Sequence, residues 1–272
     1  MKIYLTAHYL LALTVLIFSA CNGEKQQAET GKPVVLESLK IEKKAGPDCD
    51  KPDTLRMNCV EVSLSFPTIK EGSEPLKKAV SDWTSIFVVG MLDPSVEPDK
   101  IPAGVSLDSS VLKFIAFHHQ SVTDSLGGSY YFMADLKDSV LLNDGKHLTL
   151  KLDSYTFTGG AHGSPYAAVA TLETATGKKV ELNDLVTDLN ALQALAEKKF
   201  REVKAEIFLP MEDGSPGFTF DQDVFPFKLA DNTGLTNQGI YFCYVPYEVT
   251  PYAFGFTEFV IPFDEIQSIR KD

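Results

Sequence analysis

Apolar and polar residues alternate in two segments near the start of the chain, residues 34–44 and 59–69. The apolar positions are Val35, Leu36, Leu39 and Ile41 in the first segment and Val60, Val62, Leu64 and Phe66 in the second. A repeat of two residues is typical of strands with one buried face. Because the turn-forming residues 50–53, Asp-Lys-Pro-Asp, separate the two segments, the pattern predicts an antiparallel hairpin.

Apolar residues recur at helical spacing in three further segments. The first begins after Ser73, a suitable N-cap, and carries Leu76, Ala79, Val80, Trp83, Ile86 and Phe87. The second begins near Asp108 and continues to Val122, and the third covers residues 189–207. The outer face of the third segment carries charges of both signs, which is typical of a solvated surface.

Most of the remaining chain again has the pattern of strands. The predicted strands cover residues 129–137, 139–142, 147–157, 166–173, 179–182, 225–229, 239–246 and 256–262, with a short helix or turn at 263–269. The turn Asn143-Asp144-Gly145 is a strong hairpin signal between two of them. The sequence therefore predicts an α+β fold in which antiparallel sheets pack against two to three helices. Residues 34–145 form a hairpin-plus-helices half, and residues 146–272 form a second half.

The first residues have the features of an export signal. Lys2 precedes an apolar run, and small residues precede Cys21. This arrangement resembles the signal peptide of bacterial lipoproteins, so we expect residues 1–20 to be that signal peptide and Cys21 to carry lipid. An ordinary signal peptide or a short membrane helix is the alternative, but the apolar run is shorter than the roughly 20 residues that span a bilayer. Residues 21–33 are polar and predict a flexible tether, so we expect an exported, membrane-anchored lipoprotein on the periplasmic face or the cell surface.

The charge of the chain narrows the classes of partner. Its formal net charge is -12 at pH 7. Such a chain lacks the basic surface of nucleic-acid-binding proteins, so nucleic acid is not an expected partner. Basic proteins, cations and neutral glycans remain, because net charge affects solubility and steering rather than identity.

Three cysteines remain once Cys21 is assigned to lipid. Cys49 and Cys59 bracket the predicted turn of the first hairpin, and export places them in an oxidising compartment. A disulfide between them is the simplest interpretation, because no further cysteine or histidine lies nearby at the spacing of a metal site. Cys243 lies in the apolar run 240–245, which favours a buried free thiol.

The adjacent residues His118 and His119 resemble half of a metal site. Neighbouring residues on a helix point about 100° apart, however, so the two rings do not easily share one ion. No further ligand follows four residues later. We therefore expect solvated or helix-end histidines, and neither a metal nor a cofactor.

The densest group of unusual residues is the segment from Tyr155 to Tyr166, Tyr-Thr-Phe-Thr-Gly-Gly-Ala-His-Gly-Ser-Pro-Tyr. Its glycines permit positive φ and close backbone approach. Histidine is the residue type whose side chain titrates nearest neutral pH, so His162 has the chemistry of an acid, a base or a ligand. No serine elbow, His-Glu-x-x-His or phosphate loop accompanies it, so a structural corner is the competing interpretation.

A second unusual segment, residues 244–255, has the sequence Tyr-Val-Pro-Tyr-Glu-Val-Thr-Pro-Tyr-Ala-Phe-Gly. Its tyrosines, Tyr244, Tyr247 and Tyr252, have the contact area and polar handle of a glycan or peptide site, although a packed corner accounts for them equally. Glu248 lies among them, and Asp153 lies near the first segment. The separation between two such carboxylates is what decides whether a glycan hydrolase is feasible.

The two segments together carry a resemblance. Tyr-x-x-Thr-Gly-Gly-Ala-His-Gly, a following Thr-Gly-Lys turn, and Pro-Tyr-Glu-Val-x-Pro-Tyr-Ala-x-Gly before Ile-Pro-Phe resemble a family of extracytoplasmic domains, over about residues 34 to 270. This RsiV/PdaC-type accessory domain occurs as the sensor of a lysozyme-responsive anti-sigma factor and beside the catalytic domain of a peptidoglycan deacetylase. The resemblance implies an α+β envelope domain that recognises a protein or a wall component. The anti-sigma segment and the deacetylase domain with its metal-binding residues have no counterpart in this sequence.

The leading functional hypothesis is therefore a lipid-anchored cell-envelope binding module for a lysozyme-like protein or peptidoglycan. The candidate binding residues are His162, Tyr155, Tyr166, Tyr244, Tyr247, Glu248 and Tyr252. A wall or glycan hydrolase that uses His162 with Glu248 or Asp153 is the alternative, although no catalytic set is complete. A structural envelope lipoprotein is the third hypothesis.

Overall fold

The computed structural model describes residues 31–52, 55–93, 95–97, 100–101, 104–124, 130–221 and 223–271. The predicted signal peptide, Cys21 and most of the predicted tether lie outside the described residues. Among the residues described, no helix is long and apolar enough to cross a membrane.

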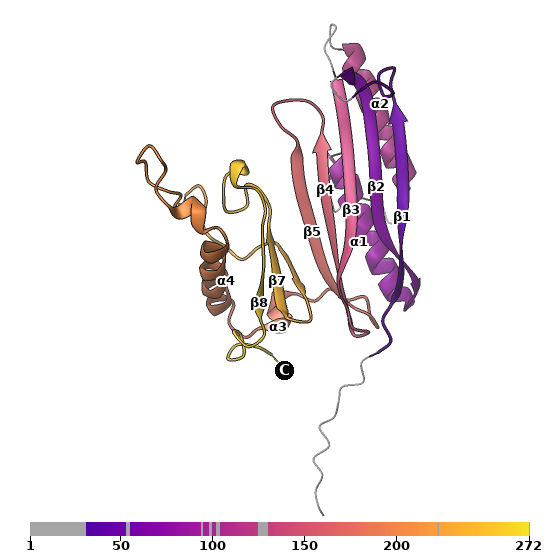
Figure 1. The fold of residues 1–272 in the computed structure, drawn as a ribbon. Helices are drawn as coiled ribbons and strands as arrows, with labels where there is room; N and C mark the ends of the chain where they lie inside the picture. The colour runs from indigo at the N-terminus through magenta and orange to yellow at the C-terminus, as the bar shows by residue number, and fades with distance from the viewer. Residues whose placement is uncertain are drawn as a thin grey trace, which may run out of the picture.

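A five-stranded sheet forms the larger part of the molecule (Figure 1). Its strands, in spatial order, are β1 (Val35–Ala45), β2 (Asn58–Glu71), β3 (Tyr130–Asn143), β4 (His147–Phe157) and β5 (Ser164–Glu173). The predicted hairpins β1–β2 and β3–β4 are confirmed as antiparallel pairs. The two short runs predicted at 129–137 and 139–142 are one continuous strand, β3, whose register shifts between Val140 and Leu142.

One junction of this sheet is parallel, that of β2 with β3. Two helices, α1 (Glu74–Leu92) and α2 (Leu107–Asp124), lie between these strands in the chain and make the long connection that a parallel pair requires. The Ser73 hydroxyl caps α1 by accepting a hydrogen bond from the Leu76 amide, as predicted. Both helices pack on the sheet face that carries Val60, Val62, Leu64, Phe132, Ala134 and Leu136.

A three-stranded antiparallel sheet follows in the second half of the chain. It contains β6 (Asn232–Leu235), β7 (Gly239–Tyr244) and β8 (Thr257–Pro262). The helical elements of this half are α3 (Leu182–Leu185), α4 (Leu189–Val203) and the 3-10 turns η3 (Ala205–Phe208) and η4 (Tyr252–Phe254). The predicted helix 189–207 thus ends early, and its last turn tightens into η3.

Two predictions for this half were wrong in position. Residues 225–229 contain no strand beyond a single bridge from Phe225 to Asp221, and the strand of this region is β6 instead. Its residues Asn-Thr-Gly-Leu lack the alternation that predicts a strand, because Gly234 is selected for close packing and not for β propensity. Residues 179–182 contribute only one bridge, from Lys179 to Leu172.

The elements stack in the order α1 and α2, five-stranded sheet, three-stranded sheet, α4 (Figure 1). Strand β7 is buried on both faces, because Phe242 and its even-numbered neighbours pack toward α4 while Tyr241, Cys243 and Val245 pack on β5. Gly234 permits the sheets to approach: a Cβ there would lie 2.7 Å from Thr149 Cγ2 and 2.8 Å from Val169 Cγ1.

The predicted disulfide is confirmed, since Cys49 and Cys59 are bonded across the turn between β1 and β2. Cys243 is a buried free cysteine, as expected from its apolar surroundings. Burial raises the pKa of its thiol to about 12, and the neighbouring Glu258 carboxylate acts in the same direction. The thiol is therefore a packing group in the folded protein.

Candidate functional site

The glycine-rich segment forms the loop between β4 and β5, whose last paired residues are Thr156 and Ser164. Gly159 and Gly160 have φ angles of 95° and 92°, which other residues rarely adopt. Gly163 serves a different purpose, because a Cβ there would lie 2.2 Å from Cζ of Tyr155. The Tyr155 ring therefore packs directly against the loop, and the three glycines are required by the shape of the loop.

His162 is exposed on this loop and stacks on Tyr252 of η4, with ring centroids 3.9 Å apart and planes tilted by 23°. Its Nδ1 lies 2.9 Å from the Gly163 carbonyl oxygen, and the Tyr252 hydroxyl donates to the same oxygen at 3.1 Å. Because a carbonyl only accepts, Nδ1 carries the proton, and a neutral ring then presents Nε2 as an acceptor. Two segments 89 residues apart are thereby joined.

Tyr247 lies beside this pair, with its ring centroid 5.7 Å from that of Tyr252. Its side chain is 59% exposed. Its φ of 70° makes it the one non-glycine residue of the described chain with a positive φ. A left-handed conformation costs a residue with a side chain about 1–2 kcal/mol, so an exposed ring is held here at an energetic cost, which is a recognised feature of binding sites.

Glu248 is not available to His162. Its carboxylate is 3% exposed and accepts hydrogen bonds from the amides of Asp231 at 2.7 Å and Val245 at 3.0 Å. Burial raises the pKa of Glu248, and the two amide hydrogen bonds offset part of that effect. The side chain holds the corner that carries Tyr247. In the described part of the chain no carboxylate lies within hydrogen-bond distance of His162.

Asp153 belongs to a separate group between the two sheets. Lys151, whose side chain is 10% exposed, donates to Asp153 at 2.8 Å and to Glu258 at 2.7 Å. Burial alone would lower the pKa of Lys151, but these two carboxylates raise it above its usual value. A glycosidase of the two-carboxylate type needs two carboxyl groups that flank a substrate, whereas Asp153 and Glu258 both pair with the Lys151 ammonium.

Two candidate tyrosines point elsewhere. Tyr244 is 1% exposed, and its hydroxyl donates to the Lys228 carbonyl at 3.0 Å within the core beneath α4. Burial raises the pKa of that hydroxyl. Tyr166 on β5 is 48% exposed, with its ring 6.2 Å from that of Phe87. Burial raises the pKa of its hydroxyl, and the nearby carboxylates of Glu248 and Asp231 act in the same direction. The structure therefore brings together the rings of His162, Tyr252 and Tyr247, places Tyr166 near Glu248 and buries Tyr244 in the core.

The rings of His118 and His119 meet edge-on with centroids 5.4 Å apart, and His118 is buried, which corrects the prediction of solvated or helix-end histidines. His118 is 1% exposed, and its ring meets Phe132 edge-on at 5.1 Å, whereas His119 is exposed. An imidazole can pack on the sheet when its apolar edge faces an aromatic ring. Within the described residues, no group of three histidine, cysteine, aspartate or glutamate side chains could hold a metal ion.

A surface next to the tyrosines was not predicted from the sequence. The loop 209–225 reaches η4 through Phe218, whose ring lies 5.5 Å from that of Phe254. The large apolar side chains that this loop exposes are Leu209 at 62%, Met211 at 59% and Val224 at 67%. The repeated phenylalanines at 218, 220, 225 and 227 were a usable signal, because so many rings are rarely placed in a solvated loop.

We call this region the aromatic–acidic end, and it comprises His162, Tyr247, Tyr252, Leu209, Met211 and Val224 with the carboxylates named next. Between residues 205 and 227 the sequence has no lysine or arginine and carries Glu206, Glu212, Asp213, Asp221 and Asp223. The β4–β5 loop, η4 and the loop after α4 lie at the same end of the molecule (Figure 1).

Comparison with known families identifies part of this structure. Residues 183–264 match the family model described as protein of unknown function, DUF3298. The predicted resemblance is thereby confirmed, because the RsiV/PdaC-type domains belong to the same domain family. None of the curated proteins matches the chain.

Two solved structures show the fold of the DUF3298 family. A family member from Bacteroides fragilis has 18% sequence identity and a TM-score of 0.59, and the match covers 89% of this chain and 95% of that one. A family member from Pseudomonas aeruginosa has 21% identity and a TM-score of 0.56, with 89% and 96% covered. The matched residues 183–264 include Tyr247 and Tyr252, whereas His162 precedes them, so the stacked pair joins the matched segment to the loop of the five-stranded sheet.

Proposed function

We propose that this chain is a lipid-anchored cell-envelope binding module that recognises a cationic protein of the lysozyme type through its aromatic–acidic end. One observation carries the proposal: the segment 205–227 has no lysine or arginine, and it carries five carboxylates and the exposed Leu209, Met211 and Val224. The basic residues just before it are engaged within the fold, because Arg201 lies over the Phe208 and Phe220 rings and Lys204 donates to the Phe254 carbonyl. A few anchor residues, among which tyrosine is prominent, supply most of the energy of protein interfaces, and the contacts around them exclude water. Acidic groups around them steer a basic partner and select against acidic ones.

The strained corner at Tyr247 supports the same surface. Residues with a strained backbone conformation cluster at binding and active sites, and Tyr247 is both strained and exposed. Glu248 and the stacking of His162 on Tyr252 hold the corner in place before any partner arrives. Rigid, exposed rings lose little entropy on binding, which favours affinity.

The decisive experiment is a calorimetric titration of the full chain with hen lysozyme, with cytochrome c as a basic protein of similar size and with muropeptides. We expect saturable binding of lysozyme that weakens as salt rises, because charge complementarity is screened within about 10 Å at 0.1 M salt. Equal binding of cytochrome c would mean non-specific attraction, and binding of muropeptides alone would transfer the function to peptidoglycan. If neither lysozyme nor muropeptides bind at near-millimolar concentration, both ligands are excluded and the proposal is overturned.

Matched variants locate the surface. Leu209 and Leu112 are both exposed leucines, at 62% and 59%, and Leu112 lies on α2 among the other layers. Leu209→Ala should weaken lysozyme binding roughly tenfold, as for an interface anchor worth above 1 kcal/mol, and Leu112→Ala should leave it unchanged. Equal effects of the two variants would contradict the proposed location.

The hydrolase hypothesis has no supporting contact in the described residues. His162 bonds to the Gly163 carbonyl, Glu248 to backbone amides and Asp153 to Lys151. A test remains simple: the full chain is incubated with purified peptidoglycan, and released muropeptides are quantified for the wild type and for His162→Ala. Turnover that depends on His162 would replace the binding proposal with a catalytic one.

A further inference from the structure

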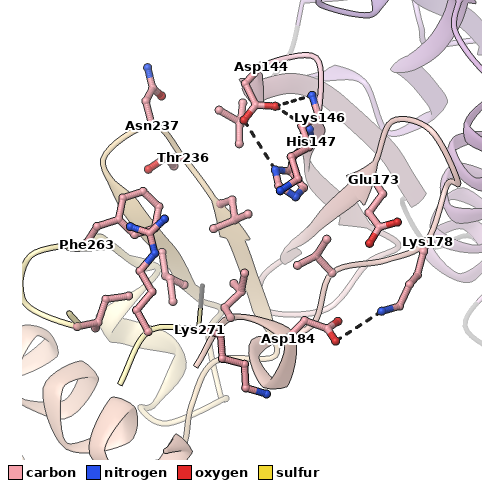
Figure 2. Close-up of a pocket in the computed structure, with 17 residues that line it drawn as sticks. Asp144, Lys146, His147, Glu173, Lys178, Asp184, Thr236, Asn237, Phe263 and Lys271 are labelled. Carbon is pink, nitrogen blue, oxygen red and sulfur yellow. Dashed lines mark hydrogen bonds and ion pairs between the residues drawn. The ribbon is translucent and has the colours of Figure 1, made fainter. Parts of the chain in front are cut away.

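A cavity of about 570 Å³ lies at the end of the molecule that carries the β3–β4 and β6–β7 turns (Figure 2). Both sheets contribute to it, together with α3 and the turns after β8. We call it the basal pocket. Its volume falls within the range of small-molecule sites, about 300–1,000 Å³. No candidate residue of the sequence analysis lines it.

The floor of the basal pocket is apolar. Its apolar lining residues are Leu142, Val180, Leu185, Leu235, Ile240, Phe263 and Ile266. Leu235 and Ile240 lie at the paired ends of β6 and β7, and Leu142 lies near the end of β3. These strands fix the floor, so it is formed before a ligand enters. An apolar floor of this size favours a ligand with a hydrocarbon portion.

The carboxylates on the rim are already used by the protein. Asp144 accepts hydrogen bonds from the amides of Lys146 at 2.8 Å and His147 at 2.6 Å. Asp184 accepts from the Glu181 amide at 3.1 Å and pairs with Lys178 at 3.5 Å (Figure 2). Glu173 accepts from the Thr176 hydroxyl. Each of these acids stabilises a local turn.

Two of the basic residues on the rim, Arg270 and Lys146, differ from the carboxylates in their contacts. The guanidinium of Arg270 lies 4.2 Å from the centre of the Phe263 ring, a cation–π contact that positions it at the pocket. No carboxylate among the described residues forms an ion pair with Arg270 or Lys146. His147 also lines the cavity, and in Figure 2 its ring points into the space between the rim segments. Four lysine and arginine residues line this cavity against three carboxylates, namely Lys146, Lys178, Arg270 and Lys271 against Asp144, Glu173 and Asp184, although the whole chain has a net charge of -12.

We propose that the basal pocket binds an amphipathic anion, with a carboxylate or phosphate head at Arg270 and Lys146 and a hydrocarbon tail on the apolar floor. An arginine offers a carboxylate or phosphate two parallel hydrogen bonds, and stacking on Phe263 preorganises it for that contact. The tail takes the place of water against the apolar side chains. A fatty acid and an anionic phospholipid share this chemistry.

The course of the chain favours such a ligand at this end. The Asn143 side chain bonds to both the amide and the carbonyl of Val34, at 2.8 and 2.9 Å, and a Cβ on Gly145 would lie 1.8 Å from the Gly31 oxygen. The first described residues thus contact the hairpin that forms one rim of the pocket. Ten residues separate position 21 from position 31, a reach of at most about 35 Å. A lipid anchor at Cys21 would therefore keep the pocket close to a bilayer.

The test is a titration of the full chain with decanoate and with dihexanoyl phosphatidylglycerol below its micellar concentration. Octyl glucoside serves as the neutral amphiphile. We expect one saturable site for at least one of the anions and none for the glucoside. Arg270→Gln should weaken that binding roughly tenfold or more, as expected for a hydrogen bond to a charged group. Lys113→Gln, which removes an exposed charge on α2, should have no effect.

A second variant addresses the floor. Val180→Trp fills the cavity and should abolish binding while the thermal unfolding temperature stays within a few degrees of the wild type. If that variant does not fold, Arg270→Gln alone decides. The stronger of the two anions identifies the source as soluble fatty acid or lipid headgroup. Absence of binding for both, equal binding of octyl glucoside, or equal affinity in Arg270→Gln and Lys113→Gln overturns the proposal. These outcomes are independent of lysozyme binding at the opposite end.

Discussion

At the scale of single residues, Tyr247 combines exposure with an unfavourable backbone conformation. Its φ is 70° and its side chain is 59% exposed. Tyr247→Gly should raise the free energy of unfolding relative to Tyr247→Ala by about 1 kcal/mol, because glycine adopts positive φ without strain. Urea denaturation of the two variants measures this difference. Both should lose affinity for the partner, since both lack the ring. Equal stability of the two variants would contradict the strain.

Glu248 should give the protein a characteristic dependence on pH. Burial raises the pKa of its carboxyl above the usual value of 4.5, so the folded protein binds this proton more tightly than the unfolded chain does. The contribution of Glu248 to stability is therefore complete below that usual pKa and is lost as pH rises through the folded pKa. The difference in unfolding free energy between the wild type and Glu248→Gln should fall steadily as pH rises from 4 to 7.

Denaturant titrations at four pH values in this range test the sign. Carboxyls with lowered pKa, such as Asp144 and Asp184, contribute to stability in the opposite direction. Their contributions are the same in both proteins, so they cancel when the unfolding free energy of the variant is subtracted from that of the wild type. Lowered pKa values make stability rise with pH at the acidic end. A difference that increases with pH would show that the hydrogen bonds from the Asp231 and Val245 amides outweigh the burial of Glu248.

The sequence could name the residues of the site but not their partners. His162, Tyr247 and Tyr252 stood out by composition, but the stacking of His162 on Tyr252 could not be predicted. The accompanying hydrogen bond from the Tyr252 hydroxyl to the Gly163 carbonyl joins residues that are 89 positions apart in the chain. Glu248 could not be recognised as buried, since its partners are backbone amides, which every segment possesses. The burial of Tyr244 could have been predicted, because β7 is apolar on both faces and such strands lie in the interior.

At the scale of elements, alternation was sufficient for the long strands and failed for β6. The strands β1 to β5 each have one face on α1 and α2, so their apolar residues alternate visibly. Strand β6 is four residues long and is specified by contact with the other sheet: the Leu235 amide donates to the Thr171 hydroxyl at 2.9 Å. Such a contact leaves no periodic signal. The parallel pairing of β2 with β3 was likewise not predicted from the sequence, although the two helices between these strands make such a pairing possible.

Gly234 should be intolerant of a larger residue, because it sets the approach of the two sheets. An added Cβ would meet Thr149, Val169 and Thr171 at 2.7, 2.8 and 3.2 Å, all on the other sheet. We expect Gly234→Ala to lower the free energy of unfolding by about 1–3 kcal/mol, the cost of overpacking a well-packed core. Gly90 in α1 has no atom within 4 Å of its added Cβ, so Gly90→Ala should instead stabilise by about 0.5–1 kcal/mol. Chemical denaturation of the pair contrasts the two, and a neutral Gly234→Ala would contradict tight contact between the sheets.

At the scale of the whole molecule, the two proposed sites lie at opposite ends of the sheets. The aromatic–acidic end carries the β4–β5 loop and η4, and the basal pocket lies where residues 31–34 meet the β3–β4 hairpin (Figure 1). A chain anchored through Cys21 would hold the pocket toward the bilayer and present the acidic surface away from it. The negative charge of that surface favours the same orientation near anionic lipid headgroups, because like charges repel.

This orientation can be measured with fluorophores attached to introduced cysteines. Asn237 lies in the exposed β6–β7 turn at the rim of the pocket, and Asp213 lies in the exposed loop of the aromatic–acidic end. Cys243 should not react in the folded protein, since burial raises its pKa to about 12. In vesicles that contain a headgroup quencher, a label on Asn237→Cys should be quenched more strongly than one on Asp213→Cys, because the tether reaches at most about 35 Å. Cys21→Ser should abolish quenching at both positions, and equal quenching of both labels in the anchored protein would exclude the orientation.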